Sequence, residues 1–175
     1  LNYRGKLWTR EEARAAMPDL WQYVDVCISN EEDAKDVFGI EAENTDIYGG
    51  KLNKEGYKSV AKQLADKFGF EKVAITLRTS ISASDNDWAA MLYDGENYCF
   101  SKEYHLHIVD RVGGGDSFGG GLIYALLSGK DTQAAVEFAV AASALKHSIE
   151  GDYNLVTVSE VEKLAGGDGS GRVQR

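Results

Sequence analysis

The sequence predicts an α/β fold, a three-layer α/β/α arrangement around a mostly parallel sheet. Helical patterns alternate along the chain with short apolar runs, and this order is typical of layered folds with parallel strands. The run 72–77 (Lys-Val-Ala-Ile-Thr-Leu) lacks polar alternation, as a strand covered on both faces does. The stretch 54–68 repeats apolar residues at helical spacing, so it predicts an amphipathic helix that packs on such a sheet.

The elements of the first half follow from capping and glycine signals. Thr9 and Glu12 have the spacing of a capping box, and Pro18 is expected to interrupt the helix that they begin. Gly39 and Gly69 follow helical patterns, as glycines that end helices do. The elements expected are a helix over 9–23, a strand over 24–29, a helix over 30–38, a loop over 40–52, a helix over 54–68 and a strand over 72–77.

The second half contains a hairpin signal, because Asp94 and Gly95 form a two-residue turn between two apolar runs. Thr132 opens an alanine-rich helix that is apolar on nearly every side, so we expect this helix to be buried. The elements expected are strands over 88–93, 97–101 and 103–109, and helices over 118–128, 132–149 and 159–165.

Composition limits the class of protein. The 175 residues carry a formal net charge of −9, which argues against a nucleic-acid backbone or an anionic membrane as partner. The apolar runs are shorter than the ~20 residues of a membrane span. Cys27 and Cys99 lie far apart in two expected strands, which favours buried thiols in a reducing, cytoplasmic setting.

The glycine turn at 113–115 is the feature around which the chain is organised. A β-branched run ends at Asp110, three glycines follow, and a helix of small residues begins near Asp116. A strand, a glycine turn and a helix N-terminus together direct backbone N–H groups at an anion. Asp116 could then accept a proton from a hydroxyl beside that anion. The residues alone leave a second interpretation open, a plain turn with Asp116 as helix N-cap.

Two common phosphate-binding loops do not fit this turn. A P-loop requires lysine after its last glycine, and the three glycines at 119–121 are not followed by one. A dinucleotide-binding fingerprint that begins at Gly113 requires a glycine where Phe118 stands.

The stretch 110–118 (Asp-Arg-Val-Gly-Gly-Gly-Asp-Ser-Phe) resembles the C-terminal signature of ribokinase-like carbohydrate kinases, Asp-Thr-x-Gly-Ala-Gly-Asp-x-Phe. Arg111 stands in the threonine position and departs from that signature. The resemblance implies a ribokinase-like fold and ATP as phosphoryl donor. It also implies that the amides of Gly113, Gly114 and Gly115 form an anion hole and that Asp116 is the catalytic base.

A second candidate site follows the first apolar strand. Asn30 and Asp33 lie at the carboxyl end of that strand, where ligands of open α/β sheets bind. With neighbouring carboxylates they could hold Mg²⁺ through water, or they could form an acid-rich first helical turn that needs no metal. The family carries Asn-x-x-Glu at this place, linked to Mg²⁺ and phosphate. The resemblance therefore implies a magnesium role for Asn30 and for Asp33, whose side chain is shorter than that of Glu.

The resemblance alone implies nucleotide contacts in two further segments. The family follows the next strand with Thr/Lys-x-Gly-x-x-Gly, and here Arg78 and Ile81 stand in the glycine positions. Arg78 could meet phosphates with its guanidinium, or it could be an ordinary surface arginine. The residues implied in phosphate or adenine binding are Asn30, Thr76, Arg78, Ser80, Ala139 and Ser143.

The first residues add a finer resemblance, to 2-keto-3-deoxygluconate kinases. These carry Asp-x-Asn-x-Arg and then Leu-Trp before this helix, and Arg4 followed by Leu7 and Trp8 matches that pattern. The resemblance implies that Arg4 contacts the carboxylate of a sugar acid, which a guanidinium can hold bidentately. Asp152 matches another acid on the sugar side of those kinases, or it belongs to a simple turn at a helix end.

His105 and His107 alternate on one expected strand, so both imidazoles face the same side and could begin a zinc site. Neither a cysteine nor a third histidine lies nearby in the sequence, so a metal role is the less favoured interpretation.

The resemblance covers the chain from Asn2 to about Val161 but only the C-terminal half of the family's usual length. We therefore expect a chain without the N-terminal strands and lid, with 1–165 as the nucleotide-binding and catalytic part and 166–175 as a glycine-rich flexible tail. The expected function is ATP-dependent phosphorylation of 2-keto-3-deoxygluconate to its 6-phosphate. The alternative is a non-catalytic nucleotide-binding remnant or interaction domain. The partners expected are ATP or ADP, a sugar acid, and either the missing half or a second copy at an open sheet edge.

Overall fold

The computed structural model describes residues 5–40 and 54–167, and the chain falls into two compact units. The first unit takes the chain up to Thr79 together with Ala89–Phe100. The second takes Ser80–Trp88 and the chain from Ser101 onward. Arg4, most of the loop expected at 40–52 and most of the expected tail lie outside the described residues.

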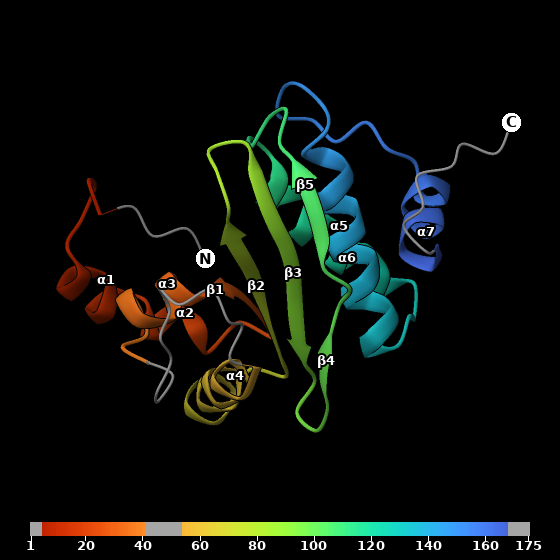
Figure 1. Cartoon of the computed structure of the whole chain (residues 1–175). Coiled ribbons are helices and arrows are strands. Elements are labelled where there is room, and N and C mark those ends of the chain that lie inside the picture. The colour runs from red at the N-terminus through yellow and green to blue at the C-terminus, as the bar shows by residue number, and fades with distance from the viewer. Residues whose placement is uncertain (1–4, 41–53, 168–175) are drawn as a thin grey trace, which may run out of the picture. The chain divides into compact units, whose positions relative to one another are not determined.

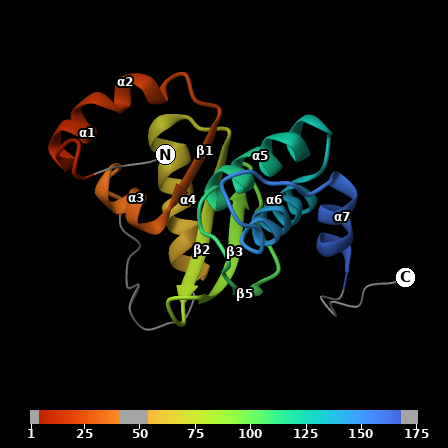
Figure 2. The same ribbon diagram turned by 90° about the horizontal axis from the view of Figure 1, so that it is seen from above.

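The helices of the first unit lie close to their predicted positions. Thr9 forms the expected capping box with Glu12, whose carboxylate accepts from the Thr9 amide at 2.7 Å. The first helix ends before Pro18, as predicted. Pro18 is instead the first residue of a new helix, a position at which proline is tolerated. Arg14 donates to backbone carbonyls at the end of the third helix, which therefore lies beside the first (Figure 2). The helices are α1 (Arg10–Ala16), α2 (Pro18–Trp21), α3 (Glu31–Asp36) and α4 (Lys54–Phe68).

The helices of the second unit differ from their predicted limits at the glycine turn. α5 (Gly114–Leu127) begins four residues before the predicted start at 118, because the glycines themselves form its first turn. α6 (Thr132–Lys146) begins after Asp131, whose carboxylate accepts from the Ala134 amide, and ends three residues before the predicted limit at 149. α7 (Val158–Gly166) begins with a second capping box, formed by Thr157 and Glu160.

The sheet is mixed, whereas the sequence predicted mostly parallel pairing. Its strand order is β1-β2-β3-β4, and β5 pairs with β3 (Figure 1). β1 (Val26–Asn30) and β2 (Lys72–Ser80) are parallel, with Asn30 opposite Thr76. β3 (Asp85–Tyr93) is antiparallel to β4 (Tyr98–Phe100) and to β5 (Tyr104–His107). The predicted hairpin at Gly95 is confirmed, and it accounts for part of the antiparallel pairing.

Large aromatic rings build the core of the first unit. Trp21 stacks on Phe38 and meets Phe68 edge-on, with ring centroids 4.4 Å apart in both pairs. Leu64, on the predicted apolar face of α4, is fully buried in the same cluster. The helical periodicity of 54–68 is therefore confirmed, because its apolar face is the face that is buried.

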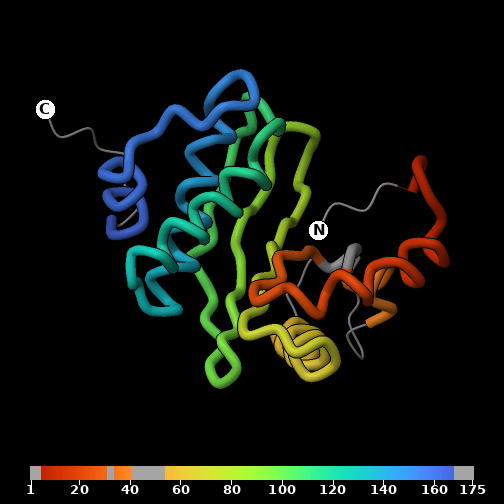
Figure 3. Tube along the Cα trace, turned by 180° about the vertical axis from the view of Figure 1, so that it is seen from behind, coloured from red at the N-terminus to blue at the C-terminus, as the bar shows by residue number. Residues whose placement is uncertain are grey.

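Small residues build the contact between α5 and α6, which run side by side in the second unit (Figure 3). A Cβ on Gly121 would lie 3.1 Å from the Cβ of Ala142 and 3.2 Å from the Cα of Ala139. The absence of a side chain at this position therefore sets how closely the two helices approach. The predicted burial of the alanine-rich helix is confirmed over 138–144.

Cys27 lies in β1 and Cys99 in β4, and no disulfide joins them. Within the ranges that the structure describes, none of the helices is both long enough and apolar enough to cross a membrane.

Candidate functional site

The N-terminus of α5 presents backbone amides at the glycine turn. Gly113 adopts the left-handed conformation (φ +79°) and directs the chain into the helix. The Ser117 amide donates to the Gly113 carbonyl, which closes the first helical turn at 2.8 Å. Among the described residues, no acceptor is bonded to the amides of Gly115 and Asp116. These two N–H groups, together with the positive end of the helix dipole, are suited to bind an anion.

Packing inside the protein requires the first two glycines of the turn. A Cβ on Gly113 would collide with the carbonyl of Asp152 and lie 3.2 Å from the Cε of Lys146. A Cβ on Gly114 would lie 2.7 Å from the Cε1 of His147, closer than carbon atoms approach without displacement. These two glycines bring the backbone down onto the end of α6.

The third glycine differs, because the position of a Cβ on Gly115 has open space around it. Gly115 is exposed, and no neighbouring group would be displaced by a methyl group there. A group from outside the protein could approach the Gly115 backbone without meeting a side chain. The open face of the turn therefore lies at the residue whose amide has no partner within the described chain.

The end of α6 supports the turn from beneath. The buried Ser143 hydroxyl donates to the Gly114 carbonyl at 2.8 Å. The backbone carbonyl of His147 accepts hydrogen bonds from the amides of Val109 and Asp110. The ring atom Nδ1 of His147 lies 2.7 Å from the Ser143 carbonyl oxygen. Hydrogen bonds on both sides of the turn therefore fix its position against α6.

Asp110 joins the turn to the segment that follows α6. Its carboxylate accepts from the amides of Val112 and Gly151, both at 2.9 Å. These two hydrogen bonds hold the pKa of the Asp110 carboxyl below its ordinary value, and the positive charge of Lys146 acts in the same direction. Asp110 is therefore a structural carboxylate that stays ionised at neutral pH.

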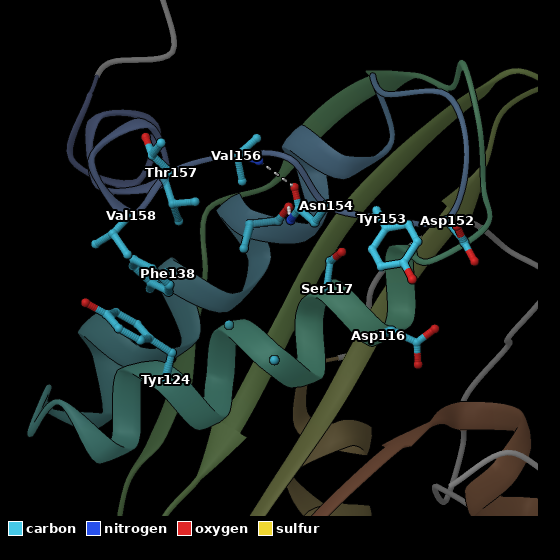
Figure 4. Close-up of a pocket in the computed structure, with 14 residues that line it drawn as sticks. Asp116, Ser117, Tyr124, Phe138, Asp152, Tyr153, Asn154, Val156, Thr157 and Val158 are labelled. Atoms are coloured by element: carbon cyan, nitrogen blue, oxygen red, sulfur yellow. Dashed lines mark hydrogen bonds between the residues drawn. The ribbon is translucent and has the colours of Figure 1, made fainter.

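A cavity of about 460 Å³ lies against this turn, between α5, α6 and α7. Its volume falls in the range of small-molecule sites. Figure 4 shows Asp116 and Asp152 at one end of the cavity, and Tyr124, Phe138 and Val158 at the other. One end is acidic and adjoins the amides of the turn, while the other is apolar and lined by rings.

The structure brings together the predicted residues that lie around the turn. Asp152 lines the cavity with Asp116, and its backbone contacts the turn. Ala139 and Ser143, expected beside an adenine, are both fully buried. Ala139 faces Gly121 of α5, and Ser143 bonds to the turn. The residues of α6 that line the cavity are Phe138 and Ala142 instead.

The other predicted ligand residues belong to the strands. Asn30 is the last residue of β1 and not the start of a helix, and Thr76 lies opposite it on β2. Arg78 and Ser80 follow on the exposed end of β2. The backbone of Asp33 lies in α3, but its side chain, like all of Arg4, lies outside the described part of the chain.

The two strand histidines each meet an aspartate on the neighbouring strand. His105 bonds to Asp87, and His107 Nδ1 lies 2.8 Å from Asp85. The Asp87 carboxylate is the main cause that raises the pKa of His105. Asp87, Glu103 and His105 bring ligand atoms within 4.8 Å of one another, but such exposed groups are common without a metal.

Lys146, His147 and the cavity rings Tyr124 and Phe138 were missed by the sequence analysis. The signal for Lys146 was present, because it is a charged residue that directly follows the alanine-rich stretch of this helix. Nothing in the sequence marks the rings, because aromatic residues at helical spacing also occur in ordinary cores.

Comparison with protein families matches residues 1–159 to the pfkB family carbohydrate kinases. The chain belongs to this family. Its curated relatives include a 2-dehydro-3-deoxygalactonokinase of Haloferax volcanii, 32% identical over 169 residues, and a 2-dehydro-3-deoxygluconokinase of Thermoproteus tenax, 26% identical over 166. These alignments cover 96% and 93% of this chain, but 46% and 44% of the relatives. This pfkB chain therefore spans about half the length of the curated relatives it matches.

Solved structures of pfkB kinases confirm the predicted fold class. The 2-dehydro-3-deoxygluconokinase from Thermotoga maritima is 50% identical with a TM-score of 0.89, over 95% of this chain and 49% of that one. A pfkB family carbohydrate kinase from Listeria grayi is 36% identical with a TM-score of 0.81, again over 95% and 49%. The ribokinase-like α/β/α class and the resemblance to 2-keto-3-deoxygluconate kinases are both borne out.

Proposed function

We propose that this chain provides the phosphoryl-transfer site of a sugar-acid kinase, which uses ATP to phosphorylate 2-keto-3-deoxygluconate at its 6-hydroxyl. The observation that carries the proposal is the pair of amides at Gly115 and Asp116, which have no acceptor within the described chain and belong to exposed residues beside the Asp116 carboxylate. An anion site beside a proton acceptor is the minimum that transfer of a phosphoryl group to an alcohol requires. The similarity to the Thermotoga maritima enzyme supports the sugar-acid class.

In this proposal, Asp116 accepts the proton of the attacking hydroxyl. Its carboxylate is exposed in the first turn of α5 and lines the cavity, so a bound alcohol can reach it. The amides of the turn, contributed by Gly113, Gly114, Gly115 and Asp116, would stabilise the charge that develops on the transferred group. Hydrogen bonds to α6 fix the turn before the substrate binds, so little reorganisation is needed.

The acidic end of the cavity is proposed as the sugar side. Asp152 lies there with Asp116, and its carboxylate can accept hydrogen bonds from sugar hydroxyls (Figure 4). Arg4 is proposed to hold the sugar-acid carboxylate. Adenine is proposed to lie near Ala139 and Ser143, and because both are buried, it would touch α6 through their accessible neighbours.

Magnesium is proposed to be held by Asn30 and Asp33, with Thr76, Arg78 and Ser80 near the nucleotide phosphates. Asn30 stands at the carboxyl end of a parallel strand, and Thr76 is its register partner on the neighbouring strand. The two positions therefore offer an amide oxygen and a hydroxyl on adjacent strands. Oxygen donors of this kind suit Mg²⁺, so the donor set fits the ion. Bound Mg²⁺ would neutralise phosphate charge.

The proposal is tested by ATP-dependent phosphorylation of the sugar acid with the parent chain and with Asp116→Asn. Each is assayed alone and co-expressed with the portion of the Thermotoga maritima relative that this chain does not match. Because an amide keeps the shape but cannot accept the proton, we expect turnover to fall about 10²–10⁴-fold while ATP binding persists. Glu96→Gln is the matched control. It also replaces a carboxylate by an amide, but in the β3–β4 turn, and it should retain activity.

Two results would contradict the proposal. Turnover of Asp116→Asn within a few fold of the parent would remove Asp116 from the role of base. ATP binding without phosphorylation under every condition would favour the non-catalytic nucleotide-binding remnant instead.

The open glycine supplies an independent test. Gly115→Ala adds a methyl group where nothing in the protein would be displaced, so the melting temperature should stay equal or rise, as alanine favours helix. Phosphorylation should nevertheless fall, because the methyl group enters the space proposed for the anion. Gly166→Ala in α7, where a Cβ is also uncrowded, is the control and should retain activity. Full activity of Gly115→Ala would show that no anion approaches the turn so closely.

A further inference from the structure

Lys146 is a buried charged residue that has no part in the reaction proposed above. It is the last residue of α6 and is 0% exposed. Removing a lysine from water is unfavourable unless its charge and its hydrogen-bond donors are used. The position of Lys146 under the glycine turn indicates what uses them.

Lys146 contacts both chain segments that meet at the turn. Its Cε lies 3.2 Å from the place of a Cβ on Gly113, so its Nζ, one bond further along, lies close to the start of α5. Nζ donates to the carbonyl of Ile149 at 2.9 Å, in the segment that leads to Asp152. One side chain therefore links the anion turn to the loop that carries Asp152.

The positive charge of Lys146 is not cancelled by a direct ion pair. Among the described residues, no carboxylate lies within 4 Å of its Nζ. Asp110 is close enough to feel the charge, but its carboxylate is bonded to the amides of Val112 and Gly151.

We propose that Lys146 is a positioning residue of the anion site. It fixes the glycine turn and the Asp152 loop from inside, and it adds a positive charge close to the turn that carries the amides of Gly115 and Asp116. This inference rests on the proposed function, because it concerns the same anion site. Since Lys146 is fully buried, it acts through the electric field and through the turn rather than by touching the substrate.

The physical basis is the weak screening of a charge inside the protein. A helix N-terminus supplies the equivalent of about half a charge, and a buried lysine adds a full one that water cannot surround. The attraction grows with the number of phosphate charges on the ligand. A structural role needs the hydrogen-bond donor of Lys146, whereas the electrostatic role needs its charge. The electrostatic role is therefore identified when a neutral side chain that keeps a donor still reduces the dependence of affinity on phosphate number.

The test measures the affinities of AMP, ADP and ATP for the full chain by calorimetry. Lys146→Met keeps an unbranched side chain but removes the charge and the donor. We expect the gain in affinity from AMP to ATP to shrink by about tenfold, with AMP binding nearly unchanged. Ser143→Ala is the matched control, because it removes a neutral hydrogen bond from beneath the same turn. In this variant the AMP-to-ATP gain should shrink less than in Lys146→Met, because no charge is removed.

Two further variants keep the proposal falsifiable if Lys146→Met does not fold. Lys146→Gln keeps a donor for the Ile149 carbonyl without the charge and should show the smaller AMP-to-ATP gain. Lys146→Arg keeps the charge and should retain the parent's gain. An equal loss for all three nucleotides, or no loss, in the neutral variants overturns the role of Lys146 while the proposed function stands. Failure of the parent chain to bind ATP at all overturns both.

Discussion

In the first unit the core is filled by large side chains, whereas in the second unit α5 and α6 meet through glycine and alanine. Trp21, Phe38 and Phe68 contact one another through their rings, with Leu64 in the same cluster. Gly121, by contrast, allows the backbone of α6 to approach so closely that even a methyl group would be crowded. The first core is therefore expected to lose stability when a side chain is made smaller, and the second when a side chain is made larger.

The difference between the two cores bears on which of them can support a rigid binding site. A core of large rings tolerates adjustment, because side chains can shift into other rotamers. A contact between helix backbones leaves no such freedom, so atoms attached to it stay in place. The Gly114 carbonyl is held by the Ser143 hydroxyl of α6, so the two exposed amides that follow it are attached to the second kind of core. A preorganised anion site requires that kind of support.

Leu64→Ala should produce the largest loss of stability. The side chain is fully buried in the first unit, so its removal leaves a cavity and should lower the free energy of unfolding by about 2–5 kcal/mol. Urea unfolding measures the change, with Gln63→Ala on the exposed face of α4 as control, expected within about 0.5 kcal/mol of the parent. A loss below 1 kcal/mol for Leu64→Ala would mean that the large-residue core repacks more freely than its burial indicates.

Gly121→Ala tests the core of small residues in the opposite direction. The added methyl group would lie 3.1 Å from the Ala142 Cβ and against the Ala139 backbone, so overpacking should lower the free energy of unfolding by about 1–3 kcal/mol. Gly120→Ala, one residue earlier, meets open space and should stabilise the helix by up to about 1 kcal/mol. If both substitutions had the same sign, the approach of α5 to α6 would not depend on Gly121.

The same difference explains which parts of the molecule the sequence predicted well. α4 was predicted over its observed limits, because large apolar residues at helical spacing identify both the helix and its buried face. α5 was predicted to start at 118 rather than Gly114, because glycine has low helix propensity and tertiary contacts with His147 and Asp152 decide its conformation. Such contacts cannot be read from local spacing.

The candidate site was predicted in part for a similar reason. The motif identified Gly113–Asp116, because backbone amides at a glycine turn leave a pattern in the sequence. The supporting residues Lys146 and His147 were missed, because their role depends on which helix end lies beneath the turn. The hairpin signal predicted the pairing of β3 with β4, but the antiparallel pairing of β3 with β5 was missed, because local spacing does not connect these two strands.

Substitutions in the two capping boxes should have the smallest effect on stability, and they allow the two units to be compared within one molecule. Thr9 with Glu12 begins α1 in the first unit, and Thr157 with Glu160 begins α7 in the second. In each box the threonine amide bonds to the glutamate, and this bond is the main cause that holds the pKa of Glu12 and of Glu160 below the ordinary value. A group with a lowered pKa in the folded state binds its proton less readily than in the unfolded chain.

The sign of the pH dependence follows from that difference. The stabilisation is fully present above the ordinary glutamate pKa and is lost as the pH falls through the lowered folded-state pKa. Glutamine can also complete a capping box, so Glu12→Gln and Glu160→Gln should unfold almost like the parent at neutral pH. Over the acidic range each variant should lose less stability than the parent does, by urea unfolding at a series of pH values. Because the boxes lie in different units, the effects of the two substitutions should add in the double variant. A steeper acid loss in either variant than in the parent would mean that its glutamate does not stabilise the helix through the bond to threonine.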